Sequence, residues 1–190
     1  MKAMLRPMFV LFLLLTALTG IVYPLAVTGI GRMAFPSQVA GSLIMRDNKP
    51  IGSSLISQSF QDPKYFWGRL SATSPMPNNA SASSGSNLGP TNPALLEAVK
   101  ARIDALRTAD PDNKLPIPVD LVTSSGSGLD PDITPAAALY QVARVARVRH
   151  IDPAKLRELV LAHVTGPQWG LLGESRVNVL TLNLSVDQSR

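Results

Sequence analysis

Few side chains in this sequence could carry out catalysis. The 190 residues include two histidines and no cysteine, which excludes thiol catalysis, disulfide bonds and zinc–thiolate sites. A serine triad can be composed on paper from His150 or His163, Ser86 or Ser127, and Asp130. The sequence has no Gly-x-Ser-x-Gly elbow, no Walker phosphate loop, no His-Glu-x-x-His motif and no calcium-loop pattern. These absences argue against a hydrolase, and His163 is better explained as a histidine at the edge of a core than as a ligand.

The long apolar stretch Met8–Ile30 is the element around which the chain is organised. It contains no charged residue, and at about 1.5 Å per residue it makes a helix of about 34 Å, enough to cross a hydrocarbon core. Gly20 and Pro24 would weaken a helix in water but are common in membrane spans. A cleaved signal peptide is the alternative, because Lys2 and Arg6 precede the stretch. Its length and the lack of an Ala-x-Ala site favour a retained anchor.

The charges around this stretch favour one orientation in the membrane. We expect residues 1–7 to be a short cytoplasmic terminus, residues 8–30 to span the bilayer, and residues 33–190 to form one domain on the outer, periplasmic side of an inner membrane. Arg32 follows the span, so basic residues flank both of its ends and the reverse orientation stays open. The domain lacks a basic stripe interleaved with aromatics, so we expect no nucleic-acid partner.

One face of the expected span carries small residues. Thr16 and Gly20 are four positions apart, and Pro24 follows another turn along. Small residues allow close approach of two helices in lipid, where no hydrophobic force drives them together. We expect Thr16, Gly20 and Pro24 to dock on a partner helix; ordinary span composition is the alternative.

The remaining sequence predicts an α+β domain. Asn92 and Pro93 begin a helix to Ala109, Thr134 caps a helix to about Arg149, and Asp152 caps a third that ends before Gly166. Strands are expected over residues 42–46, 51–57, 117–123 and 177–186, the last from its alternation of apolar and polar residues. Arg144, Arg147 and Arg149 crowd one helix end, where a solvated face is the default interpretation.

Two loops are candidates for contact with a partner. Tyr65, Phe66 and Trp67 lie close together, and such rings either pin a loop to the core or anchor a partner interface. The uncharged stretch Ser71–Pro93 is expected to lie on the domain as a long loop, in which Gly85, Ser86 and Asn87 offer backbone donors and small polar groups.

Several segments together resemble one family, the C subunit of the bacterial Kdp-type potassium-transporting ATPase. In chain order they are GSLI (Gly41–Ile44), FQDPKYFWGRLSAT (Phe60–Thr73), SSGSNLGPTNP (Ser83–Pro93), VTSSGSGLDPDIT (Val122–Thr134), QVARVARVR (Gln141–Arg149) and VNVLTLNLSVD (Val177–Asp187). Each segment alone is unspecific, but their shared order is specific, and the resemblance covers nearly the whole chain.

The resemblance implies a non-catalytic accessory subunit with one membrane helix and an outer domain. In that family it joins a potassium-binding, channel-like subunit to a P-type ATPase subunit; the complex uses ATP, magnesium and potassium, and no cofactor is expected on this chain. The sequence agrees, having neither an Asp-Lys-Thr-Gly phosphorylation motif nor a Thr-Val-Gly-Tyr-Gly filter. A membrane-anchored module that binds a periplasmic solute or cell-wall material is the alternative function.

Overall fold

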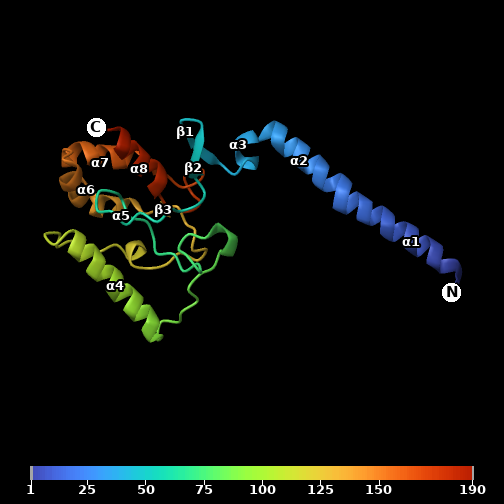
Figure 1. Ribbon diagram of the computed structural model, residues 1–190, viewed down its shortest axis with the longest axis horizontal. Coiled ribbons are helices and arrows are strands. Elements are labelled where there is room, and N and C mark those ends of the chain that lie inside the picture. The colour runs from blue at the N-terminus through green and yellow to red at the C-terminus, as the bar shows by residue number, and fades with distance from the viewer. Residues whose placement is uncertain (1, 190) are drawn as a thin grey trace. The chain divides into compact units, whose positions relative to one another are not determined.

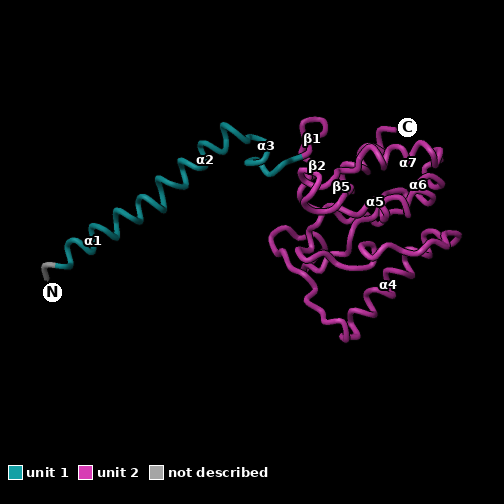
Figure 2. Tube along the Cα trace, turned by 180° about the vertical axis from the view of Figure 1, so that it is seen from behind, with its two compact units in different colours: residues 1–43 teal, residues 44–190 magenta. Residues whose placement is uncertain are grey.

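The computed structural model describes residues 2–189, which form an N-terminal helical unit and a mixed helix and strand domain. The two compact units comprise residues 1–43 and 44–190 (Figure 2). In chain order the elements (Figure 1) are α1 (Lys2–Ala17), a π-helical turn (Leu18–Val22), α2 (Tyr23–Ala34), α3 (Pro36–Val39), β1 (Leu43–Arg46), β2 (Lys49–Ser53), a 3₁₀ turn (Ala80–Ala82), α4 (Pro93–Ala109), a 3₁₀ turn (Val119–Leu121), β3 (Asp132–Ile133), α5 (Pro135–Tyr140), α6 (Val142–Arg149), α7 (Pro153–Ala162), β4 (Val164–Thr165), β5 (Arg176–Asn178) and α8 (Val179–Gln188).

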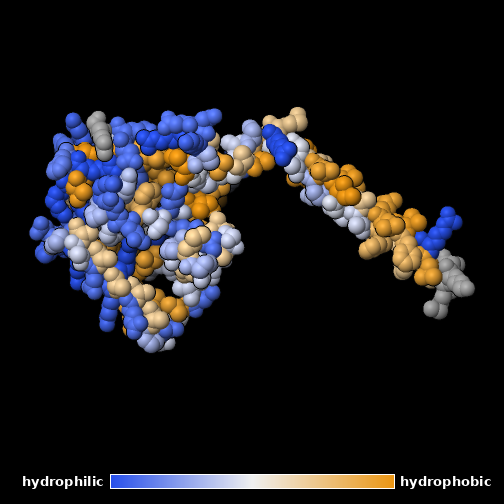
Figure 3. Space-filling model, in the orientation of Figure 1, coloured by the Kyte–Doolittle hydropathy of each residue, from blue (hydrophilic) through white to orange (hydrophobic). Residues whose placement is uncertain are grey.

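The N-terminal unit is one long apolar helix. Met4–Ala34 is long and apolar enough to cross a membrane, and none of its side chains is buried in the chain itself; Figure 3 shows apolar residues along its surface. The helix changes winding at Leu18–Val22, where the Tyr23 amide donates to the carbonyl of Leu18, five residues earlier. Pro24 follows directly, and because proline lacks an N–H and its ring displaces the preceding turn, a π turn relieves the clash.

The domain's core is built mainly by helices α4 to α8. Buried apolar side chains from these helices meet Phe66, Trp67 and Leu121. A small antiparallel sheet of order β3-β5-β4 joins them, with Ile133 and Val164 both opposite Val177. β1 and β2 form a separate hairpin whose turn residues Asp47 and Asn48 have φ of 50° and 60°. Those left-handed angles are the ones a tight hairpin turn requires, and Asx residues tolerate them.

Several sequence expectations are confirmed. α4 has the expected bounds, with the Asn92 side chain accepting from the Ala94 amide at 3.0 Å and Leu106 buried. Thr134 and Asp152 cap α5 and α7 as expected. The helix expected over 134–149 is interrupted at Gln141, which separates α5 from α6.

The strand expected over Val177–Val186 is wrong beyond its start. Only Arg176–Asn178 is a strand, and α8 follows it. The Asn178 side chain accepts from the Thr181 amide at 3.1 Å and so begins the helix. The buried residues Val179, Leu182, Asn183 and Val186 recur with helical spacing. The sequence pattern does not show this spacing, because asparagine is a polar residue and Asn183 is nevertheless buried.

The strand expected over Ile117–Thr123 is also wrong. The segment makes a 3₁₀ turn at Val119–Leu121 that is introduced by Pro118. Pro116 and Pro118 cannot donate to a ladder, so a strand that includes them cannot be paired along both edges.

Asn178 joins three parts of the domain and provides a test of this arrangement. Besides capping α8, its Nδ2 donates to the Ser54 carbonyl at 2.9 Å and to Asp132 Oδ1 at 3.2 Å. Asn178→Ala should lower the free energy of unfolding by about 1–3 kcal/mol. Denaturant titration of the full chain in detergent, followed by tryptophan fluorescence, measures the change. Gln188→Ala at the exposed end of α8 is the control, and equal midpoints for the two variants would contradict this role.

Candidate functional site

Side chains, rather than a neighbouring strand, hold the segment Asp62–Arg69. This segment has no helix or strand of its own, yet it enters the core at Phe66 and Trp67. Five of its backbone carbonyls accept hydrogen bonds from side chains elsewhere in the domain: Pro63 from Arg144, Lys64 from Arg149, Phe66 from Asn183, Trp67 from Gln141 and Gly68 from Arg102. The hydrogen bonds at Phe66 and Trp67 are buried, where backbone carbonyls must be paired, and long polar side chains meet that need. We call this set of contacts the clamp.

Two buried amides form the centre of the clamp. Asn183 Oδ1 accepts from the Phe66 amide at 2.8 Å, and Asn183 Nδ2 donates to the Phe66 carbonyl at 3.0 Å. Gln141 does the same for Trp67, at 2.8 Å and 3.0 Å. Each side-chain amide therefore bonds both polar groups of one residue, as a paired strand would. The two amides come from the α5–α6 junction and from α8, so the clamp ties these elements together.

Arg144 completes the clamp from α6. Its side chain is 2% exposed; Nη2 donates to Gln141 Oε1 at 2.6 Å and Nη1 donates to the Pro63 carbonyl. Its guanidinium lies 4.6 Å from the Trp67 ring centre, and that of Arg102 lies 5.0 Å from it. Burial lowers the pKa of Arg144 to about 10, which leaves it charged at neutral pH.

The expected solvated face of arginines is therefore wrong in part. Arg144 is buried in the clamp, and the Arg149 side chain is largely covered, 2.6 Å from Asp187 Oδ1. Arg147 is about half exposed and pairs with the buried Asp110 at 2.8 Å. These cations bind carbonyls, rings and two carboxylates within the domain, which a count of charges along a helix does not reveal.

The three expected aromatic anchors have different positions. Phe66 and Trp67 are buried, which favours the core-pinning alternative for both. Tyr65 is half-buried, with its hydroxyl 3.3 Å from Asp187 Oδ2 and its ring 4.8 Å from the Arg149 guanidinium. Of the three, Tyr65 alone keeps part of its ring at the surface of the domain.

Gly85 lies where two loops meet. A Cβ placed on Gly85 would be 2.8 Å from the Gly126 carbonyl oxygen, so this position requires glycine. Next to it, the Ser84 amide donates to the Ser127 carbonyl at 3.0 Å. Ser86 is half-buried, and Asn87 is exposed with φ of 51°. The long uncharged loop is thus held to the domain, and Asn87 is the exposed member of the expected group.

The residues of the serine triad considered in the sequence analysis do not form a triad in the structure and have other partners. His163 lies 2.8 Å from the Leu159 carbonyl and 2.9 Å from Ser185 Oγ, and Asp130 pairs with Arg69 at 3.2 Å. His150 ends α6 in a left-handed conformation. Across residues 2–189, no group of three or more His, Asp or Glu side chains is placed to hold a metal ion.

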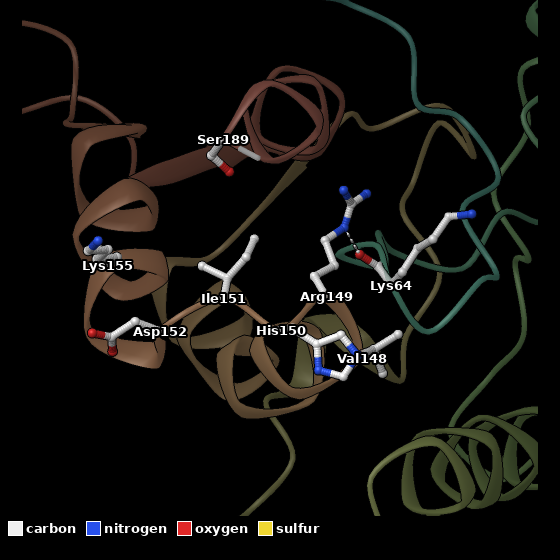
Figure 4. A pocket seen from close by; sticks show the side chains of 8 residues that line it. All are labelled: Lys64, Val148, Arg149, His150, Ile151, Asp152, Lys155 and Ser189. Atoms are coloured by element: carbon white, nitrogen blue, oxygen red, sulfur yellow. Dashed lines mark hydrogen bonds between the residues drawn. The ribbon is translucent and has the colours of Figure 1, made fainter.

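An open pocket of about 630 Å³ lies where α6 ends and α7 begins (Figure 4). Val148 and Ile151 contribute apolar surface, and Lys64, Arg149 and Lys155 contribute cations. Arg149 donates to the Lys64 carbonyl, as the dashed line in Figure 4 shows, and pairs with Asp187. Lys64 pairs with Asp62 at 3.0 Å. With two of its cations neutralised, this pocket has no strong preference for an anion.

In the apolar helix, the expected docking residues lie around the π turn. Thr16 is in α1, Gly20 is inside the turn, and Pro24 is in α2. A Cβ on Gly20 would meet no atom within 4 Å, so its surface is open within this chain. The π turn interrupts the 3.6-residue register, so the face through Thr16 and Gly20 is rotated before it reaches Pro24.

Comparison with known proteins decides the family. Residues 5–188 match the family model described as KdpC, K+-transporting ATPase, c chain. The chain is 66% identical over 187 residues to the potassium-transporting ATPase KdpC subunit of Dechloromonas aromatica, covering 98% of both chains. It is also 66% identical to that of Polaromonas naphthalenivorans (98% and 95% covered) and 62% identical to that of Methylibium petroleiphilum over the full length of both.

This chain belongs to the KdpC family. The match includes both the apolar helix and the domain, which confirms the resemblance drawn from the sequence. The segments that carry the resemblance to KdpC also supply most of the clamp: Phe60–Thr73, Gln141–Arg149 and Val177–Asp187 contain the held carbonyls and the donors Gln141, Arg144, Arg149 and Asn183. The sequence does not predict the roles of these donors, because only the fold brings the distant segments together.

The clamp predicts that replacing Arg144 destabilises the domain. Arg144→Met should lower the free energy of unfolding by about 2–4 kcal/mol, because it removes the donor to the Pro63 carbonyl and to the buried Gln141 Oε1 and one of the two cations beside Trp67. Arg144→Lys should recover part of the loss. Thermal unfolding of the full chain in detergent measures both.

Arg157→Met on the exposed side of α7 provides the control, with an expected change within about 0.5 kcal/mol. If Arg144→Met unfolds at the same temperature as this control, Arg144 does not stabilise the clamp.

Proposed function

We propose that this chain is a non-catalytic accessory subunit of an ATP-driven, high-affinity potassium uptake complex, and that it stabilises the assembly of a potassium-binding, channel-like subunit with a P-type ATPase subunit. The observation that carries the proposal is the end-to-end match to a family whose members are named KdpC subunits of a potassium-transporting ATPase. In this scheme ATP, magnesium and potassium are handled by the partner subunits.

The character of the domain supports a role in assembly. Several polar side chains hold the domain's own backbone, as the clamp illustrates; His163 bonds to the Leu159 carbonyl and to Ser185 Oγ of α8, and His150 ends α6. A rigid domain joined to an apolar helix suits a part that holds larger subunits in place.

We further propose that the helix crosses the bacterial inner membrane once, with residues 1–7 in the cytoplasm and the domain in the periplasm. Lys2 and Arg6 before the span support this orientation through the positive-inside rule. The exposed apolar surface of Met4–Ala34 is what lipid or partner helices would cover.

Extraction of the complex from membranes in mild detergent tests the proposal directly. An affinity-tagged chain should co-purify with a channel-like subunit and a P-type ATPase subunit, and its deletion should reduce the recovery of these two together. A fully folded, membrane-bound chain without companions would contradict the proposal and favour a solute- or cell-wall-binding module.

Gly20→Leu tests the proposed helix contact. A Cβ at this position would meet no atom of this chain within 4 Å, so the variant is chosen to report on a neighbouring helix. On a docked face it should hold the helices apart, and the complex should lose the subunit during detergent purification by about tenfold while the variant still inserts. Leu18→Ile is the control. Co-purification of Gly20→Leu as firm as that of the unchanged protein would exclude this face.

Single cysteines test the orientation, since the natural chain has none. Ser81→Cys and Ser189→Cys lie at exposed positions in the domain and should react with a membrane-impermeant thiol reagent applied from the periplasmic side. Ala3→Cys, before the span, should be protected until the membrane is permeabilised. The reverse labelling pattern would place the domain in the cytoplasm.

A further inference from the structure

The loop Gly166–Gly173, between β4 and β5, exposes large apolar side chains. Trp169 is 87% exposed, Leu171 is 85% exposed and Leu172 is 55% exposed. All eight residues of the loop, GPQWGLLG, are uncharged. A folded domain rarely displays a tryptophan and two leucines together in water without a purpose.

The loop has a defined shape. The Gln168 amide donates to the Leu172 carbonyl at 2.8 Å, the Leu172 amide donates back to the Gln168 carbonyl at 2.9 Å, and the Gly170 amide donates to the Pro167 carbonyl at 3.1 Å. Trp169 has φ of 53°, a left-handed conformation that bulky residues seldom adopt. Backbone strain at an exposed ring suggests that presenting this ring has a use.

The loop leads into β5, a strand whose end contacts the N-terminal part of the domain. Asn178, at the end of β5, donates to the Ser54 carbonyl just after β2, and Figure 2 shows β2 and β5 close together. Only residues 35–43, which include the short helix α3, lie between Ala34 and the domain unit that begins at residue 44. Those residues span at most about 30 Å when fully extended. The short connector therefore keeps the domain as a whole near the bilayer that the helix is proposed to cross.

The chemistry of this side fits a lipid surface. Tryptophan and leucine partition into the interface, where the indole meets headgroups and leucine meets acyl chains. The β1–β2 hairpin adds exposed Met45 together with Arg46 and Lys49, whose charges complement anionic headgroups. The loop offers roughly 400 Å² of apolar surface, well below the ~800 Å² per partner of a stable protein interface, so a second copy would not be held by it alone.

We propose that the loop Gly166–Gly173 is a membrane-interface anchor: Trp169, Leu171 and Leu172 insert at the headgroup level and hold the domain against the bilayer. The proposal rests on the membrane attachment proposed above. The tether makes a weak anchor sufficient, because it keeps the loop at high local concentration near lipid. The loop then sets the tilt of the domain and its distance from the bilayer, which attachment through residues 35–43 alone would not fix.

Tryptophan fluorescence in vesicles tests the anchor on the full chain. The chain has two tryptophans, and Trp67 is buried in the core, so subtracting the spectrum of Trp169→Phe isolates Trp169. In phosphatidylcholine–phosphatidylglycerol vesicles with brominated acyl chains, Trp169 emission should fall about twofold or more relative to unbrominated vesicles, and aqueous iodide should quench it weakly. The remaining emission of Trp169→Phe should not respond to bromine.

Leu171→Ser should at least halve the bromine quenching, whereas Leu115→Ser, at an exposed leucine elsewhere in the domain, should leave it unchanged. Both variants should still float with the vesicles, because the helix holds them; a chain that fails to float reports a fault in membrane attachment rather than in the loop. Trp169 that is open to iodide and insensitive to bromine would overturn the proposal. Shielding from both quenchers in the complex purified from native membranes would also overturn it, since a protein subunit would then cover the loop.

Discussion

The domain depends on pairing the buried backbone groups of Phe66 and Trp67. Once Phe66 and Trp67 enter the core, the polar groups beside them must find partners away from water. Gln141 and Asn183 supply these partners, and Arg144 and Arg102 add cations against the Trp67 ring. α4, α6 and α8 all contribute to the same short segment, so their packing and the position of the segment are a single arrangement. A buried polar network of this kind fixes one geometry when it is fully bonded and is costly when one member is missing.

The same constraint explains where charged side chains and exposed apolar side chains lie in the protein. Arginines crowd α6, but they are used inside the domain for carbonyls, rings and Asp187, and the neighbouring pocket is left with few unmatched charges. Exposed apolar residues gather on the helix Met4–Ala34 and, in the domain, on the loop around Trp169. Several polar side chains of the domain thus bind groups inside it, while the most exposed apolar surface lies on the helix and on this loop.

Local signals in the sequence predicted the elements that local chemistry controls. Asn92-Pro93, Thr134-Pro135 and Asp152-Pro153 marked helix starts because a cap and a proline act on their own turn. Asp47-Asn48 marked a hairpin for the same reason. The apolar stretch from Met8 to Ile30 was evident because length and composition alone define it. The family could be identified from the sequence because the resembling segments occur in the same order as in that family.

Errors arose where a distant contact decides the local structure. α8 was read as a strand because Asn183 interrupts its apolar stripe, and this asparagine is buried only because Phe66 lies opposite, 117 residues earlier. Arg144 was read as solvated because its targets, Pro63 and Trp67, belong to another part of the sequence. The sequence does not decide whether Phe66 and Trp67 belong to the core or to an interface, because aromatic residues occur in both settings. It does not single out the loop around Trp169 either, since three apolar residues between glycines have no periodicity.

The clamp also has a consequence for the order in which the protein is made. The segment around Phe66 leaves the ribosome early, but Asn183 and Asp187, which help to hold it, belong to the last helix of the chain. Until that helix emerges, Phe66 and Trp67 have no finished site, and their backbone remains open to wrong pairings. Folding of this domain therefore depends on long-range contacts, and damage to α8 disturbs a segment 117 residues earlier.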